Sequence, residues 1–267
     1  RELTLLFCDV RDFTSISERL SATELTRFIN ELLTPLSEVI LRNRGTIDKY
    51  MGDAIMAFWN APLAVPEHAA QACRSALEMA ASMRELNRRW REEAEAAGRP
   101  FREVRIGIGI NTGNCCVGNL GSVQRFDYSV IRDEVNVASR FEGLAKTYGL
   151  TAIVGEQTIR TARGIRALEL DLVRVVGREK PAAIFTLSDL LDGSAEDIDR
   201  LQPFHLQFLR AYREGRWDDA EAAIAACRSL NISKLDPYYA VFQRRIAAYR
   251  VAPPPEDWGG VFTAQEK

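Results

Sequence analysis

Residues 45–58 constrain the fold most, because they predict a β-hairpin with charged groups near its tip. Lys49 precedes the turn and Asp53 follows it directly. Aspartate is depleted in strands, so a carboxylate held on a hairpin adds little to the sheet. Asp9 ends a second apolar strand, over residues 3–8. If these strands are neighbours, two carboxylates converge on one point, which suits a hard cation such as Mg²⁺ or Mn²⁺.

The order of the predicted elements indicates a ferredoxin-like α+β sheet with helices on one face. After the first strand, the capping-box pattern at residues 21–24 opens a long amphipathic helix. Pro35 lies inside that helix and predicts a kink or break there. The hairpin is followed by predicted helices over 67–96, 133–148 and 156–162, and by strands over 104–111, 115–118, 126–131, 151–154, 168–176 and 182–187.

The composition changes after about residue 190, which predicts one domain over 1–190 and a helical extension with a tail over 191–267. The Gly, Trp and Ala spacing in residues 212–220 resembles one tetratricopeptide unit. A single such unit is seldom stable alone, so we expect a helical cap packed on the main domain. Beyond it, the prolines at 253–255 lead into an extended tail.

Bulk properties exclude several classes of protein. The formal charge of −2 gives no basic field for nucleic acid, and no run of about 18 apolar residues could span a membrane. Five cysteines without CxxC spacing are typical of reduced cytosolic thiols, and none of the chain resembles a signal peptide. The only histidines, His68 and His205, argue against serine–histidine catalysis or a His-rich zinc site.

Residues 126–140 supply a second set of chemical groups. Asn136 and Arg140 are four residues apart, so they share one face of the predicted helix. An amide beside a guanidinium suits a ribose and a phosphate. The buried stripe of this helix is predicted to comprise Val135, Ala138, Phe141 and Ala145.

These residues together resemble the class III nucleotidyl cyclases, over residues 1 to about 188. Three family patterns carry the likeness: an aspartate before Phe-Thr, a lysine four before a second aspartate, and an asparagine four before an arginine. They are present here as Asp9 with Phe13-Thr14, Lys49 with Asp53, and Asn136 with Arg140. The segment at residues 176–181 is also similar to the last hairpin of the family.

The resemblance implies an adenylate cyclase that converts ATP to 3′,5′-cyclic AMP and pyrophosphate. Asp9 and Asp53 would hold two Mg²⁺ or Mn²⁺ ions per site, which would activate the ribose 3′-hydroxyl and neutralise the triphosphate. Arg140 would stabilise charge on the α-phosphate. The other implied substrate-binding residues are Asn136 at the ribose, Arg105 at the terminal phosphates, Lys49 and Ser129 at the base, and Phe13 and Thr14 after the first aspartate.

In this family the metal aspartates come from one chain and the remaining groups from another, so the resemblance implies a homodimer with shared sites. Lys49 can only donate, which suits adenine N1, and the Ser129 hydroxyl can accept from the adenine amino group. Guanine would favour a carboxylate at the lysine position, so ATP is the predicted substrate. Ser129 resembles the threonine of a bacterial-type subgroup.

Three residues depart from the pattern or lack a role. Arg132 stands where the family usually has glycine, and a positive φ there would strain the backbone. This leaves open a catalytically silent regulatory dimerisation domain, and a guanylate cyclase is a third reading. Asp12 also replaces a frequent glycine and receives no role, and Asp48 is expected to be a strand-surface charge.

The chain begins at Arg1 and enters a strand almost at once. Together with the family resemblance, this start predicts a piece of a bacterial membrane-anchored receptor. We therefore expect the chain on the cytosolic side, not inserted in the membrane itself but attached to an upstream sensor.

Overall fold

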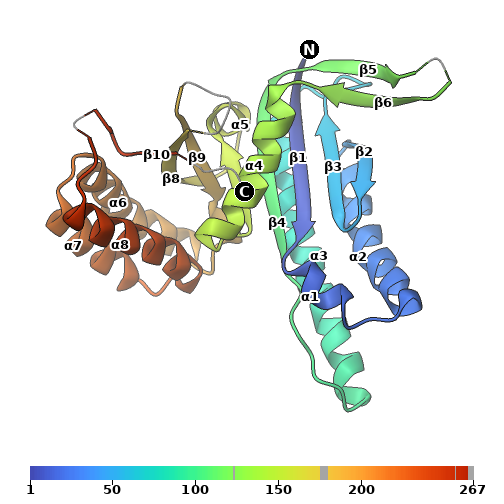
Figure 1. The fold of residues 1–267 in the computed structure, drawn as a ribbon, viewed down its shortest axis with the longest axis horizontal. Coiled ribbons are helices and arrows are strands. Elements are labelled where there is room, and N and C mark those ends of the chain that lie inside the picture. Colours follow the sequence, from blue (N-terminus) through green and yellow to red (C-terminus); the bar gives the residue numbers. More distant parts are fainter. Residues whose placement is uncertain (123, 175–179, 256, 264–267) are drawn as a thin grey trace.

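The protein is built on an eight-stranded mixed sheet with the order β10-β8-β9-β7-β4-β1-β3-β2, and β5 and β6 form a separate antiparallel ribbon (Figure 1). The computed structural model describes residues 1–122, 124–174, 180–255 and 257–263. The strands are β1 (Glu2–Val10), β2 (Thr46–Met51), β3 (Ala54–Trp59), β4 (Ile106–Asn114), β5 (Cys116–Gly121), β6 (Phe126–Ile131), β7 (Ala152–Gly155), β8 (Ala167–Arg174), β9 (Ala182–Leu187) and β10 (Val261–Thr263).

The helices are α1 (Phe13–Ser17), α2 (Ala22–Arg42), α3 (His68–Ala96), α4 (Asp133–Tyr148), α5 (Glu156–Thr161), α6 (Ala195–Arg213), α7 (Trp217–Arg228) and α8 (Asp236–Val251). The predicted elements up to residue 187 are present, and β6, α4 and β9 have the predicted bounds. The segment predicted as the last family hairpin falls largely on residues 175–179, outside the described residues.

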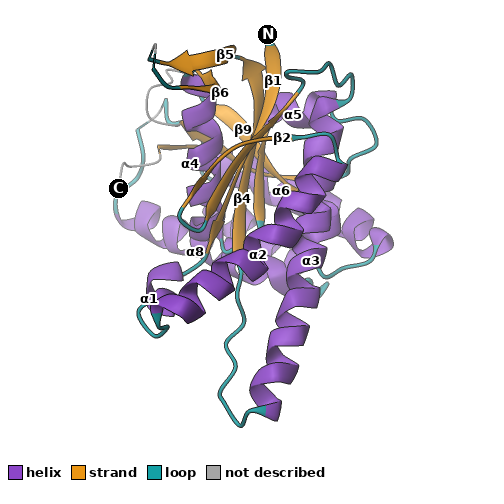
Figure 2. Cartoon of the chain, turned by 90° about the vertical axis from the view of Figure 1, so that its right-hand side faces the viewer, coloured by secondary structure: helices purple, strands orange, loops and turns teal. Residues whose placement is uncertain are grey.

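The ferredoxin-like α+β class is confirmed, but the helices do not all lie on one face. Helices α2 and α3 cover one side of the sheet, while α4 and the β5–β6 ribbon lie on the other (Figure 2). The sequence of β4 explains both contacts. Its isoleucines 106, 108 and 110 join the α2–α3 cluster. Gly109 faces α4, where an added Cβ would lie 2.1 Å from the Ala138 carbonyl oxygen, so only glycine lets the helix approach this closely.

Helix α2 begins with the predicted capping box. The Glu24 backbone N–H donates to Ser21 Oγ at 3.3 Å, and the Ser21 N–H donates to Glu24 Oε2 at 2.9 Å. The expected break at Pro35 does not occur, because α2 continues through it to Arg42. Buried residues on both sides of the proline, including Leu32 and Leu36, hold this helix against the sheet.

Helices α6, α7 and α8 pack on the sheet through one apolar cluster that also contains residues of α4 and β7–β9. The predicted tail contains a short strand that the sequence analysis did not predict, because β10 pairs in parallel with β8. Trp258 explains the return of the chain: its ring lies 5.2 Å from that of Tyr212, and its Nε1–H donates to the Val261 carbonyl at 2.9 Å.

The histidines and cysteines have structural environments. His205 is fully buried, with Nε2 2.6 Å from the Glu169 carbonyl oxygen and Nδ1 2.9 Å from the Tyr239 hydroxyl. All five cysteines are free, and four of them are buried. In the described part of the chain, no helix has the length and apolar character needed to cross a membrane.

Candidate active site

Asp9 and Asp53 form a pair of carboxylates at one end of the sheet. Cys8 pairs with Ile55 in the antiparallel β1–β3 ladder. Asp9, one residue after Cys8, therefore lies near Asp53, which is two residues before Ile55. The Val10 N–H donates to Asp9 Oδ1 at 2.9 Å. Burial, followed by the interaction with the neighbouring Asp9 carboxyl group, raises the pKa of Asp53 to about 7. A cation bound beside Asp53 would favour the charged form of this carboxyl group.

The donor set fits a hard divalent cation that is shared with a ligand. The described residues contain no cluster of three or more His, Cys, Asp or Glu side chains that could hold a metal alone. Mg²⁺ commonly binds through one or two carboxylates, with phosphate oxygens and water completing its shell. Asp9 and Asp53 supply those two carboxylates.

Arg105 and α1 lie at the same end of the sheet as the carboxylate pair. Val10 pairs with Ile106, and the Arg11 N–H donates to the Arg105 carbonyl at 2.8 Å, which fixes the exposed Arg105 beside the end of β1. In α1, Phe13 packs against the cluster under α2, while Thr14 is exposed. The phenyl ring therefore anchors this turn to the core.

Asn136 and Arg140 lie on α4 as predicted, with Asn136 exposed and Arg140 partly buried. The predicted stripe beneath them is confirmed: Ala138, Phe141 and Ala145 are buried and Val135 is packed against the core. An added Cβ at Gly113 would meet Glu134, and one at Gly107 would meet Glu142, so α4 runs along β4. Asn136 therefore lies toward the end of the sheet opposite Asp9, which pairs with Gly107.

Arg11 is a residue of this site that the sequence reasoning missed. Its Nη1–H donates to Glu142 Oε1 at 2.9 Å, and both side chains are largely buried. The guanidinium occupies the space beside Gly107, where a Cβ would lie 1.9 Å from Nη2. It thus ties the strand of Asp9 to the helix of Arg140. Only its position two residues after Asp9 could have pointed to it.

Lys49 lies on the face of the main sheet that carries α4, and Ser129 lies on the separate β5–β6 ribbon. Lys49 pairs with Met56, whose side chain shares a cluster with Val130 and Ala138. The lysine side chain is 50% exposed, whereas Ser129 on β6 is 8% exposed. The lysine is thus open to a ligand, and the serine hydroxyl is largely covered in a single chain.

The structure changes the interpretation of the unusual residues. Arg132 has φ 167°, which is extended backbone open to any residue, so the expected strain is absent. Asp12 has φ 56°, a left-handed conformation that aspartate tolerates, and it forms ion pairs with Arg102 at 3.5 Å and Lys146 at 3.7 Å. The expectation that Asp48 is a surface charge was wrong, because its side chain is only 1% exposed.

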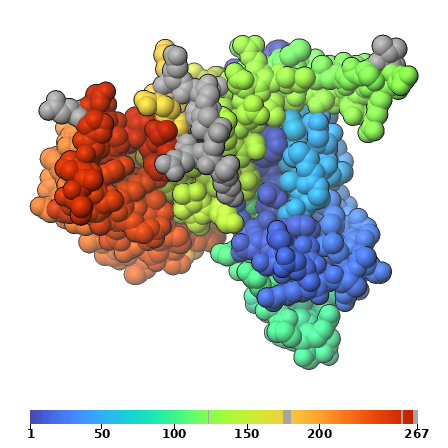
Figure 3. Space-filling view, viewed as in Figure 1, coloured from blue at the N-terminus to red at the C-terminus, as the bar shows by residue number. Residues whose placement is uncertain are grey.

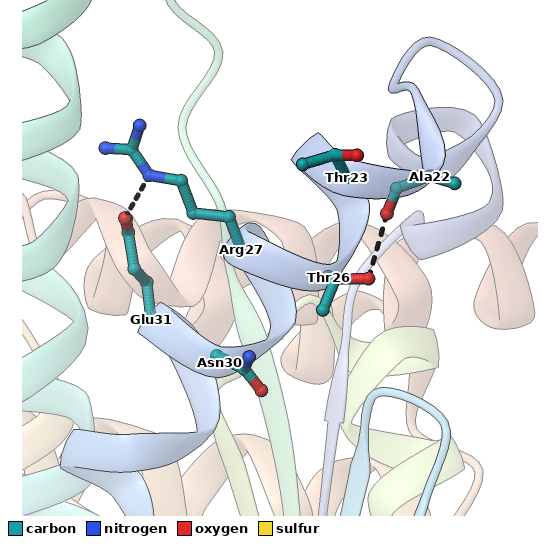
Figure 4. Close-up of a pocket in the computed structure, with 6 residues that line it drawn as sticks. All are labelled: Ala22, Thr23, Thr26, Arg27, Asn30 and Glu31. Carbon is teal, nitrogen blue, oxygen red and sulfur yellow. Dashed lines mark hydrogen bonds and ion pairs between the residues drawn. The ribbon is translucent and has the colours of Figure 1, made fainter.

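A surface hollow elsewhere does not coincide with these groups. Figure 4 shows that its lining comes from α2 alone, including Arg27, whose Nε–H donates to Glu31 Oε1 at 2.6 Å. None of the predicted site residues lines it. The chemically distinctive groups are instead spread over an open face of the sheet and along α4.

Comparison with known proteins points to the adenylate and guanylate cyclases. The family model described as the adenylate and guanylate cyclase catalytic domain matches residues 1–188. Adenylate cyclase 1 of Rhizobium meliloti (strain 1021) is 36% identical over 190 residues, or 66% of this chain. The adenylyl cyclase CyaB from P. aeruginosa has a TM-score of 0.63 and 33% identity, covering 73% of this chain and 95% of that one.

The guanylyl cyclase Cya2 is also similar, with a TM-score of 0.58 and 30% identity over 70% of this chain and 92% of that one. The chain spans 28% of the length of Adenylate cyclase 1. Relatives with either base preference therefore share this fold, and the choice of base depends on individual side chains.

Proposed function

The chain belongs to the family of adenylate and guanylate cyclase catalytic domains, and we propose that it converts ATP to 3′,5′-cyclic AMP and pyrophosphate. The observation that carries this proposal is the convergence of Asp9 and Asp53 at one end of the sheet, where burial and the neighbouring Asp9 carboxyl group raise the pKa of Asp53 to about 7. A bound cation would stabilise the charged form of such neighbouring carboxyl groups. The relative named as an adenylate cyclase, at 36% identity, supports the same reaction.

In the proposed reaction, Asp9 and Asp53 hold Mg²⁺ or Mn²⁺, expected as two ions per site. Bound divalent ions supply Lewis-acid activation of a hydroxyl and neutralise phosphate charge. Arg140 donates to the α-phosphate as negative charge grows there, a role typically worth about 3–4 kcal/mol. Asn136 orients the ribose, and Arg105, which is exposed beside the carboxylates, binds the terminal phosphates.

We propose that two copies of the chain complete each site. Asn136 lies toward the end of the sheet opposite Asp9, so one chain does not collect all the groups around one nucleotide. The β5–β6 ribbon projects beyond the rest of the surface (Figure 3) and exposes large apolar side chains, with Phe126 62% and Ile131 61% exposed. An exposed apolar patch of this kind marks an interaction surface.

The base preference rests on Lys49, which can donate to adenine N1 but cannot accept from guanine N1–H. Its exposed ammonium supports an ATP site, with Ser129 and the backbone near Phe13 and Thr14 as further contacts. GTP as the better substrate would overturn this assignment. The extended backbone at Arg132 removes the one argument for a silent domain.

The test combines two inactive variants, Asp53→Ala and Arg140→Ala. Each homodimer should lose cyclic AMP formation, because every site lacks one essential group. A mixture should regain activity, since a heterodimer keeps one intact site. Random association predicts about a quarter of the wild-type rate, because half of the dimers are mixed and each has one site. Wild-type protein that is dimeric yet inactive with ATP and GTP, under Mg²⁺ and Mn²⁺, would overturn the proposal.

We also propose that the domain acts on the cytosolic side of a longer membrane-attached sensor. The free cysteines and the absence, in the described ranges, of a helix able to span a membrane are compatible with that setting. Fractionation of cells that express the full-length gene, with the cyclase activity assayed in each fraction, tests it. Activity that is wholly unassociated with membranes would contradict it.

A further inference from the structure

The buried side chain of Asp48 is the feature that the proposed reaction leaves unexplained. It is 1% exposed, and neither carboxylate oxygen has a hydrogen-bond partner among the described residues. Burying a carboxylate without such partners is unfavourable, because the group loses its hydration. Retention of this charge on an edge strand is therefore a disadvantage for folding.

The nearest opposite charge is that of the neighbouring residue. Lys49 Nζ lies 3.4 Å from Asp48 Oδ2, a looser contact than an optimal charged hydrogen bond. The ammonium itself is on a side chain that is 50% exposed. One member of the pair is thus enclosed by protein, and the other faces the solvent where a ligand would bind.

A backbone irregularity makes this pairing possible. The β2–β3 register shifts between Ile47 and Lys49, so Asp48 is the extra residue of a β-bulge. Neighbouring residues of a regular strand point to opposite faces, but a bulge re-aims one of them. Ile47 packs in the α2–α3 cluster, and Lys49 faces Met56 on the α4 side. The bulge lets two consecutive charged side chains meet.

We propose that Asp48 is a positioning residue that holds the Lys49 ammonium in place for the purine base, and so sharpens the preference for adenine over guanine. This inference rests on the proposed cyclase function. The lysine side chain is a flexible four-carbon stem, and it loses rotamer freedom when its ammonium group binds a ligand. A fixed carboxylate beneath it restricts that freedom before the nucleotide arrives. The lysine N–H groups that are not directed to Asp48 remain available to adenine N1.

The test is Asp48→Asn, which keeps the shape and removes the charge. We expect the KM for ATP to rise about five- to tenfold, as for loss of a charge-assisted contact, with kcat changed less than about threefold. The ratio of kcat/KM for ATP over GTP should fall. At the same time, the melting temperature should stay the same or rise, because a buried charge is gone. A residue with only a structural role would give the opposite pattern, with lower stability and unchanged selectivity.

The double variant Asp48→Asn/Lys49→Ala shows whether the effect passes through the lysine. In a Lys49→Ala background, Asp48→Asn should leave the KM for ATP unchanged within about twofold. Asp48→Ser provides a second variant should the first fail to fold, and Glu38→Gln, at an exposed position of α2, is the matched control. An unchanged ATP:GTP ratio in an active Asp48→Asn protein would overturn the inference alone. No activity in the wild type would overturn the proposed function instead.

Discussion

The two ends of helix α4 lie in contrasting environments. The first two turns, which form the open end, carry Asn136, which is exposed, and Arg140, which is partly buried. The last turn, which forms the closed end, carries Tyr148. This residue is fully buried among aromatic rings from α8, and its ring centroid lies 6.4 Å from that of Phe242 and 5.8 Å from that of Tyr238.

Buried charge reinforces the closed end. The Tyr148 hydroxyl donates to Asp171 Oδ2 at 2.6 Å, and Arg245 Nη1–H donates to the same oxygen at 2.7 Å. The Arg245 guanidinium also lies 3.7 Å from the centroid of the Phe262 ring. Helix α4 is thus anchored by a satisfied core at one end, while its other end carries the exposed Asn136.

The largest expected effect is at the closed end. Phe242→Ala should lower the free energy of unfolding by about 3–5 kcal/mol, because the ring is fully buried and lies 4.7 Å from Tyr212. Urea unfolding measures the change. Phe204→Ala, at a site that is 40% exposed, is the control and should cost less than about 1 kcal/mol. Equal effects at both positions would show that the aromatic cluster is not a tightly packed core.

The open end should show the reverse pattern. Arg140→Ala should lower kcat by about 100-fold or more while the free energy of unfolding changes by less than about 1 kcal/mol. Cyclic AMP production and urea unfolding are measured on the same sample. Arg27→Ala, on the exposed face of α2, is the matched control and should leave kcat unaltered. A loss of folding that parallels the loss of kcat would place Arg140 in the scaffold.

A third test uses the pH dependence of the protein's stability, to which the buried His205 contributes. Burial lowers the pKa of His205 to about 4, from an ordinary value of 6.5. Below pH 6.5 the unfolded chain binds a proton that the folded chain does not, so this group's stabilising contribution falls as the pH falls toward 4. Between pH 7 and pH 5 the loss is about 2 kcal/mol.

His205→Gln should remove this loss of stability between pH 7 and pH 5, although the variant is expected to be less stable than the wild type at pH 7. The two proteins must be compared because Asp53 acts in the opposite direction. Its pKa is raised to about 7, so its contribution to the stability of the metal-free protein increases as the pH falls over this range. Thermal melts of both proteins at pH 5, 6 and 7 provide the measurement. Parallel pH curves for the two proteins would contradict a neutral buried histidine.

The smallest expected effect concerns Arg132, where the open end of α4 begins. Because its backbone is extended, Arg132→Gly should change the stability by no more than about 1 kcal/mol and should not raise kcat. Steady-state assays with ATP check this. A large gain of activity in the glycine variant would revive the reading of the wild type as a silent domain.

Local sequence was sufficient for most of the sheet. Short apolar runs and the capping box at Ser21 predicted β1, α2 and the hairpin, since these signals act between near neighbours. The same reasoning missed β10, because its pairing with β8 depends on Trp258 packing against helices far away in the chain. It also placed the helices on one face, since spacing does not say which side of the sheet a helix covers.

The sequence by itself determined the chemical groups of the candidate site and the order in which they appear, from Asp9 to Arg140. It did so because residue type and spacing decide which groups share a turn or a helix face. Tertiary structure alone decided that Asp9 and Asp53 lie close together, that Arg11 binds Glu142, and that the side chain of Asp48 is buried. These depend on strand register, a bulge and the close approach of α4 at Gly109, which only the folded chain sets.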